Sequence, residues 1–249
     1  MTDFESWIEA LGARHQSDLT FSEISRSLRA LSSTYVERRH RLREGAALTG
    51  AGKRAAFALF YGPLHYLLIR DIVRALPGAA AAARVLVDLG CGTGASGAAW
   101  ASECRERPQV VGIDRHPWAL AEAGRTYREF HLRARTRQAD VATAEWPPSP
   151  ALLLAAFTVN ELADEARDAV LARLFDRALR GDLVLVVEPL AGGAAPWWNR
   201  WRDATRLAGG RVDEWRLRVE LPPIVEKLDR AAGLNHRELT GRSLWLALH

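Results

Sequence analysis

The fold is decided by the stretch Val85-Leu86-Val87-Asp88-Leu89-Gly90-Cys91-Gly92-Thr93-Gly94, a short apolar run that ends in a glycine-rich loop. An uninterrupted apolar run of this length is typical of a strand buried on both faces of a parallel sheet. Glycines lack a Cβ atom, so the loop backbone can approach a bound ligand closely. Residues 97–107 follow with a helical composition. The stretch therefore predicts a strand, a ligand-binding loop and a helix.

Apolar runs of the same kind recur further along the chain, at residues 110–114, 152–157 and 183–188. Helical segments separate them, roughly at residues 97–107, 117–132 and 165–179. Strands that alternate with helices indicate an α/β fold with a mostly parallel, doubly wound sheet. The chain closes with residues 236–240 and 243–248, which we expect to form an antiparallel hairpin through Gly241 and Arg242.

Residues 1–80 have helical rather than strand periodicity. Thr20 and Glu23 have the spacing of a capping box, and the apolar stripe Ile24, Leu28, Leu31 and Tyr35 follows them. Small residues at 45–52 predict a break, Gly62-Pro63 predicts an interruption, and Pro77-Gly78 predicts the end of a helix over residues 64–76. We expect residues 1–80 to form a helical cap on an α/β domain of residues 81–249.

Composition excludes several classes of protein. The chain carries 34 Lys and Arg against 30 Asp and Glu, an excess of +4 that permits a nucleic-acid partner without requiring one. The two cysteines, Cys91 and Cys104, form no zinc pattern, so we expect reduced thiols and no metal. We find neither a charge-free apolar run of about eighteen residues nor a secretory signal. We therefore expect a cytoplasmic protein without a membrane segment.

Three acidic residues follow the predicted strands in register with the glycine loop. Asp88 directly precedes the glycines, where an acid can orient the loop and face a ligand ammonium group. Asp114 ends the second strand, where a carboxylate can accept hydrogen bonds from both hydroxyls of a ribose. Asp140, followed by the apolar Val141, stands where an acid can hold an adenine amino group. The three acids, in register with the loop, indicate a ligand site rather than solvated strand ends.

Two cofactors fit a glycine loop of this kind. Gly92, Gly94 and Gly97 match the G-x-G-x-x-G fingerprint of dinucleotide-binding proteins, so NAD is an alternative. However, the order D-x-G-x-G-x-G resembles the loop of class I S-adenosylmethionine (SAM) dependent methyltransferases. That resemblance implies a Rossmann-like methyltransferase fold and SAM as cofactor. The residues it implies for the cofactor site are Asp88, Gly90, Cys91, Gly92, Gly94, Asp114, Asp140, Val141 and Asn160.

The segment after the third apolar run limits the chemistry. It reads Phe157-Thr158-Val159-Asn160-Glu161-Leu162, and it lacks both the Pro-Pro motif of many amino-group methyltransferases and the Pro-Cys of enzymes with a covalent cysteine. Asn160 and Glu161 are candidates to contact SAM or the methyl acceptor, or else they begin a helix.

Three further catalytic candidates are Glu188, Tyr61 and His65. Glu188 ends a strand, where ligands bind in such sheets, although a structural role is an equal alternative. Tyr61 and His65 could cover the SAM pocket, or be structural. Residues 197–202 mix tryptophan with arginine, which suits stacking on nucleic-acid bases. We favour the alternative, an amphipathic helix with its tryptophans packed inward.

A second resemblance concerns residues 27–39 and 51–61, together with Asn160-Glu161-Leu162 and Val187-Glu188-Pro189. These stretches are similar to a methyltransferase-like family associated with the small ribosomal subunit. Members often carry an iron–sulfur cluster, for which two cysteines cannot supply four ligands. The resemblance implies RNA or the small ribosomal subunit as partner, and ribosomal RNA as methyl acceptor. The alternatives are a small-molecule or protein-side-chain methyltransferase, and a non-catalytic SAM-binding assembly factor.

Overall fold

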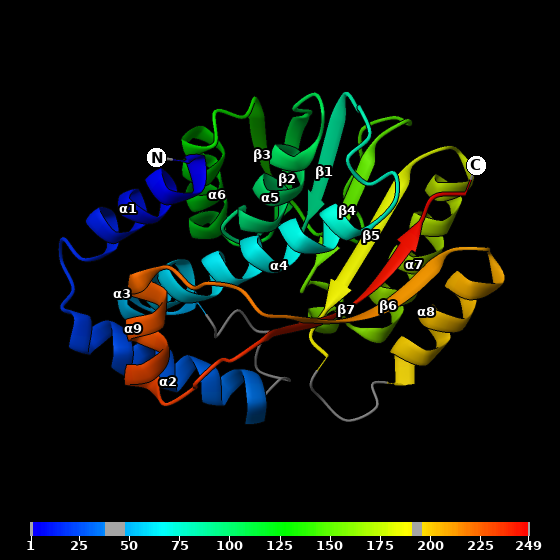
Figure 1. Ribbon diagram of the computed structural model, residues 1–249. Coiled ribbons are helices and arrows are strands. Elements are labelled where there is room, and N and C mark those ends of the chain that lie inside the picture. Colours follow the sequence, from blue (N-terminus) through cyan, green and yellow to red (C-terminus); the bar gives the residue numbers. More distant parts are fainter. Residues whose placement is uncertain (1, 38–47, 191–195, 249) are drawn as a thin grey trace.

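A seven-stranded sheet organises the chain (Figure 1). The computed structural model describes residues 2–37, 48–190 and 196–248. The strand order is β3-β2-β1-β4-β5-β7-β6, with β1 to β5 parallel and β7 antiparallel to both of its neighbours. This order confirms the mostly parallel, Rossmann-like sheet. The strands are β1 Val85–Leu89, β2 Gln109–Asp114, β3 Ala134–Gln138, β4 Leu152–Ala156, β5 Leu183–Glu188, β6 Arg211–Leu217 and β7 Leu239–Leu246.

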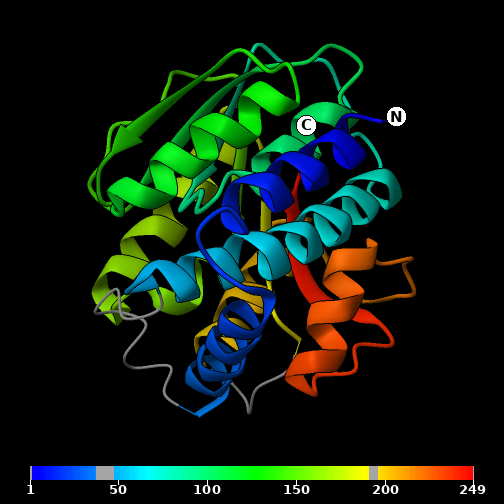
Figure 2. The same cartoon turned by 90° about the vertical axis from the view of Figure 1, so that its left-hand side faces the viewer.

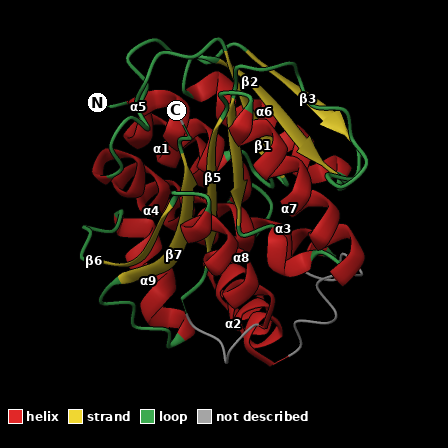
Figure 3. Ribbon diagram, turned by 90° about the vertical axis from the view of Figure 1, so that its right-hand side faces the viewer, coloured by secondary structure: helices red, strands yellow, loops and turns green. Residues whose placement is uncertain are grey.

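Helices cover both faces of this sheet (Figure 3). One hydrophobic cluster joins one face to α4, α5 and α6, and another joins the opposite face to α7 and α8. The helices are α1 Asp3–His15, α2 Phe21–Glu37, α3 Ala51–Ala56, α4 Gly62–Ala75, α5 Ala95–Glu103, α6 Pro117–Glu129, α7 Asp164–Leu179, α8 Pro196–Leu207 and α9 Pro223–Ala232, with a π-helix η3 Phe57–Tyr61 and a 3₁₀ turn η4 Val159–Glu161.

The predicted C-terminal hairpin with its turn at Gly241 and Arg242 is wrong. Gly241 and Arg242 lie inside the single strand β7, whose antiparallel partner is β6, and α9 connects the two strands. A Cβ atom on Gly241 would lie 3.1 Å from the Cδ2 atom of Leu68. The glycine therefore marks the close approach of α4 to the sheet rather than a turn.

The expected interruption at Gly62-Pro63 is also wrong. Residues 51–75 form one continuous helix in which α3, η3 and α4 follow each other without a break. The Gly62 N–H donates to the Phe57 carbonyl, five residues back, so the π-helical turn takes up an extra residue just before Pro63. This helix is long and apolar enough to cross a membrane, but 72% of its most apolar window is buried inside the molecule, which is typical of a core helix.

The beginning of α2 agrees with the sequence pattern. The Glu23 N–H donates to Thr20 Oγ1 at 3.3 Å and the Thr20 N–H donates to Glu23 Oε2 at 2.8 Å, which is the predicted capping box. Ile24, Leu28 and Leu31 are fully buried. The side chain of Tyr35 and residues 38–47, which include parts of the predicted break and of the ribosomal-family resemblance, lie outside the described part of the chain.

The N-terminal helices share one layer with a helix from the C-terminal part of the chain. α9, from the C-terminal part of the chain, packs beside α2 (Figure 2). One continuous hydrophobic cluster joins Trp7 of α1, Phe60 of η3 and Val225 of α9 to the sheet. The division of the chain at residue 80 stays a prediction.

The tryptophans of α8 pack inward. Trp198 and Trp201 are buried against the sheet face that α7 also covers. The guanidinium of Arg242 lies 4.1 Å from the ring of Trp198, and that of Arg167 lies 5.1 Å from the ring of Trp197. The helix is therefore the expected amphipathic one.

A buried carboxylate attaches α1 to α6. Glu122 is fully buried and accepts hydrogen bonds from Arg14 and, at 3.2 Å, from His15. Burial acts to raise the pKa of Glu122, but the hydrogen bonds from His15 and Arg14 outweigh it and lower this pKa to about 2. The carboxylate is therefore ionised at neutral pH and pairs the two helices.

We predict that Glu122→Ala lowers the free energy of unfolding by about 3 kcal/mol, because it removes the buried partner of Arg14, His15 and Arg125. Urea unfolding at pH 7 measures the change. Glu129→Ala, at the end of the same helix, is the matched control and should change stability by less than about 0.5 kcal/mol. Equal losses in the two variants would show that the ion pair does not hold α1 in place.

Candidate functional site

The glycine loop between β1 and α5 has a backbone that requires glycine. Gly90, Gly92 and Gly94 have φ angles of +68°, +50° and +78°. A Cβ atom on Gly90 would lie 2.4 Å from Thr158 Oγ1, and one on Gly94 would lie 3.0 Å from the Cα atom of Ala123. The loop is thus pressed against the end of β4 on one side and against α6 on the other.

Asp88 connects this loop to the helix that follows it. Its carboxylate is buried, and its Oδ2 accepts hydrogen bonds from the Gly97 N–H at 3.1 Å and from the Tyr127 hydroxyl at 3.0 Å. Burial raises the pKa of Asp88 to about 7, against the effect of these two hydrogen bonds. Asp88 thus ties the end of β1 to α5 and α6, while its contact with a ligand ammonium group stays a prediction.

Cys91 contributes only its backbone to the loop surface. Its side chain is buried, and its Sγ lies within 3.0 Å of the position that a Cβ on Gly112 would occupy. Burial raises the pKa of this thiol well above its ordinary value, so it is neutral. The side chain therefore points into the core, and the predicted cofactor contact of Cys91 is restricted to main-chain atoms.

Asp114 touches the glycine loop directly. Its Oδ2 accepts a hydrogen bond from the Gly92 N–H at 2.9 Å, and its Oδ1 accepts one from the His116 N–H at 2.8 Å. The residue is partly exposed, and each oxygen keeps a lone pair for a further donor. The structure therefore brings together the glycine loop and Asp114, the residue predicted to bind the ribose, at the carboxyl ends of β1 and β2.

Asp140 and Val141 follow β3. The Asp140 Oδ1 accepts from the Ala142 N–H at 2.8 Å, and its Oδ2 lies 3.9 Å from a nitrogen of Arg115. Val141 is buried in the hydrophobic cluster on the α7 side of the sheet. Asp140 thus lies close to Arg115, the residue directly after Asp114. The contact of Asp140 with an adenine amino group stays a prediction.

Two buried side chains clamp the 3₁₀ turn η4 after β4. Glu188 is fully buried, and its Oε1 accepts from the Val159 N–H at 2.7 Å and from the Asn160 N–H at 3.3 Å, while its Oε2 accepts from the Asn160 side-chain amide at 2.5 Å. On the other side, the Arg167 guanidinium donates to the carbonyl oxygens of Val159 at 3.2 Å and Leu162 at 2.7 Å. The turn is therefore held by its N–H groups and by its carbonyl groups at once.

Glu188 thus positions the turn, while its role as a catalytic candidate stays a prediction. Burial raises the pKa of Glu188 to about 8, although the hydrogen bonds from Asn160 and Val159 act to lower it. The side-chain amide of Asn160 donates its hydrogen bond to Glu188. Its predicted contact with SAM would therefore use other atoms of the residue.

Phe157 holds an unusual backbone conformation between β4 and the turn. Its φ angle is +59°, a region that an aromatic residue rarely occupies. The Phe157 N–H donates to the Val187 carbonyl at 2.7 Å, and the next residue, Thr158, donates its hydroxyl to the Leu89 carbonyl at 2.9 Å. Strain of this kind concentrates at functional sites. No feature of the sequence marks Phe157 as special.

Four aromatic rings, from Phe57, Tyr61, His65 and Phe157, lie beside the glycine loop, and we call them the aromatic group. His65 stacks on Phe157 with ring centres 3.9 Å apart and an angle of 17°, and its ring also contacts Phe57 and Tyr61. Phe57 lies 3.8 Å from the position of a Cβ on Gly92. Burial lowers the pKa of His65 to about 3 and raises that of Tyr61 to about 12, so both are neutral at pH 7.

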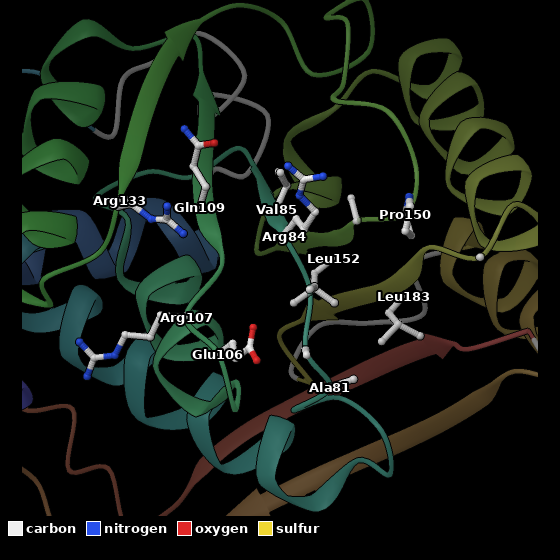
Figure 4. A pocket seen from close by; sticks show the side chains of 14 residues that line it. Ala81, Arg84, Val85, Glu106, Arg107, Gln109, Arg133, Pro150, Leu152 and Leu183 are labelled. Carbon is white, nitrogen blue, oxygen red and sulfur yellow. The ribbon is translucent and has the colours of Figure 1, made fainter.

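A hollow of about 570 Å³ lies at the opposite end of the sheet (Figure 4). It is lined by the first residues of β1, β2, β4 and β5 and by Arg84, Arg107 and Arg133. Cofactors of open α/β sheets bind at the carboxyl ends of the strands, so this hollow is not the cofactor site. No group of three or more His, Cys, Asp or Glu suited to a metal ion occurs within the described residues.

We predict that the free energy of unfolding falls as the pH rises from 5 to 8. A carboxyl group whose pKa is raised in the folded state stabilises the protein below its unfolded pKa, and that stability is lost as the pH rises through the folded value. Glu188→Gln should flatten the decline by about 1 kcal/mol per pH unit. Urea unfolding at three pH values measures the slope, with the exposed Glu165→Gln as control. A variant slope equal to that of the wild type would contradict the assignment to Glu188.

Comparisons with known proteins agree with this geometry. Residues 86–181 match a methyltransferase domain family. No curated protein sequence matches the chain significantly. The ribosomal-subunit-associated family finds no support in these comparisons.

Several solved structures share the fold. An O-methyltransferase family protein from Burkholderia thailandensis has a TM-score of 0.58 at 13% identity, over 90% of this chain and 71% of that one. A SAM-dependent methyltransferase from Leishmania major has a TM-score of 0.55 at 15% identity, over 86% and 85%. An O-methyltransferase from neocarzinostatin biosynthesis, in complex with SAM and a naphthoic acid, has a TM-score of 0.52 at 17% identity, over 96% and 74%. Residues 86–181 thus match a methyltransferase domain, and the chain has the Rossmann-like fold of these solved methyltransferases.

Proposed function

We propose that the protein transfers a methyl group from SAM to a compact acceptor that binds between the aromatic group and Glu161. The observation that carries this proposal is the position of the aromatic group, beside the glycine loop and at the end of β4. Ligands of such sheets bind at this end. A methyl acceptor must reach the cofactor from a neighbouring surface, and the aromatic group is such a surface.

The chain's own residues fit the cofactor. Asp114 offers two carboxylate oxygens to the ribose hydroxyls, and the left-handed glycines place no side chain between the loop backbone and a ligand. When bound, SAM supplies an activated methyl group on a positively charged sulfur. Methyl transfer is a direct displacement, so the main contribution of the protein is to align the acceptor and exclude water.

The chemistry of the aromatic group favours a planar, mostly apolar acceptor. Its rings carry no charge at neutral pH, because the pKa of His65 is about 3 and that of Tyr61 about 12. Aromatic faces bind planar molecules by stacking. Two of the three similar structures are described as O-methyltransferases, which supports a hydroxyl group as the acceptor.

An RNA acceptor is the alternative that the sequence suggested. Two of the three tryptophans of α8, Trp198 and Trp201, are buried and therefore not free to stack on bases. Exposed arginines do occur on the edge strand β3, at Arg135 and Arg137. This strand, however, carries no aromatic ring on which a base could stack, so we keep RNA as an outcome of the experiment.

We predict that Asp114→Asn weakens SAM binding roughly 10- to 100-fold, because hydrogen bonds to a charged group contribute about 1.5–3 kcal/mol. Calorimetric titration of SAM measures the affinity, and the exposed Asp18→Asn serves as control. Unchanged binding by Asp114→Asn, or no binding by the wild type, would overturn the site.

The acceptor class is tested with SAM that carries a labelled methyl group. The wild type and His65→Ala are incubated with the low-mass fraction and the RNA fraction of a cell extract. We expect label in low-mass products, and less of it with His65→Ala at equal SAM affinity. Label in RNA would replace the compact acceptor by an RNA acceptor, and no label in either fraction would contradict a compact acceptor.

A further inference from the structure

Glu161 is the last residue of the clamped turn, and it has a carboxylate without a hydrogen-bond partner. No described residue donates a hydrogen bond to it. The two residues before it are bonded to Glu188, and the carbonyl of the residue after it is bonded to Arg167. The backbone is therefore fixed on both sides while the side chain is left free. Such an arrangement is typical of a side chain that is kept in place for a ligand.

The charged groups near Glu161 lie at the ends of two strands. Asp114 and Arg115, at the end of β2, act on it in opposite directions, and Glu188, at the end of β5, is close enough to feel its charge. Its side chain is partly accessible but closely surrounded by protein, and burial, followed by Asp114, raises the pKa of Glu161 to about 7. Glu161 and Asp114 are thus two carboxyl groups close enough to interact, and Asp114 is bonded to the glycine loop.

Resting on the function proposed above, we propose that Glu161 is the second carboxylate of the cofactor site and that it loses its proton when the positively charged cofactor binds. The sulfonium of SAM is bonded to the ribose through a single carbon, so a ribose on Asp114 brings the positive charge to the same space. A positive charge near two carboxyl groups favours the ionised form of both.

The same group can balance the methyl transfer. The acceptor oxygen or nitrogen forms a bond to the methyl carbon as the bond from sulfur to that carbon breaks, and its proton passes to the Glu161 carboxylate. The sulfur loses its positive charge in the same step, so Glu161 becomes neutral just as its cationic partner disappears. The net charge of the site stays constant, and an acceptor with an O–H or N–H group is required.

The test uses calorimetric binding of SAM and of S-adenosylhomocysteine, which lacks the methyl group and the positive charge. Titrations in phosphate and in Tris buffers, which differ in ionisation enthalpy, report the protons released on binding. For the wild type we expect about half a proton per SAM at pH 7, more at pH 6 and almost none at pH 8.5, following a group with a pKa near 7. S-adenosylhomocysteine should release clearly fewer protons than SAM.

Glu161→Gln should remove most of this release and reduce the preference for SAM over S-adenosylhomocysteine about tenfold, the equivalent of one pKa unit. Glu165→Gln, on the first turn of α7, is the matched control and should behave as the wild type. If Glu161→Gln releases as many protons as the wild type, or the two ligands release equally, the proposal is wrong although SAM binds. If the wild type binds no SAM, the proposed function fails as well.

Discussion

The site depends on one steric constraint, the absence of a side chain at Gly90. The space that a Cβ would need is occupied by Thr158, only 2.4 Å away. This close approach lets the Thr158 hydroxyl bond to the Leu89 carbonyl, so the loop after β1 and the segment after β4 are tied together. The glycine loop and the segment after β4 therefore share one rigid junction, and a change at either residue displaces both.

Around this junction, the protein buries carboxylates and surrounds them with donors. Asp88 and Glu188 are both nearly inaccessible, and each accepts hydrogen bonds from the main chain of the segment that it positions. A buried carboxylate is costly without such partners, so each one selects a single loop conformation. Glu161 differs from both because its backbone is held and its carboxylate is not. That contrast separates a positioning residue from one that is placed for a ligand.

The sequence predicted the parts that depend on local pattern. The apolar parallel strands, the glycine loop and the acid after β2 have strong signatures, and the structure brings them together at one end of the sheet. The rest depends on tertiary contacts. β3 is exposed and rich in arginine, so no apolar run marks it, and the partner of β7 is a charged strand beyond a helix. The strained backbone of Phe157 has no signal in the local sequence, because it is held by a hydrogen bond to Val187, which is distant in the chain.

The acceptor surface that we propose is built from distant parts of the chain, so the glycine-loop motif carries no information about it. The aromatic group combines three residues of the helix at 51–75 with one residue after β4, and α9, inserted between β6 and β7, supports the same layer beside α2. The loop that binds the cofactor is contiguous and thus readable in sequence. The acceptor surface exists only once the N-terminal helices and the C-terminal insertion have packed together. Acceptor specificity can therefore change through these helices while the glycine loop stays the same.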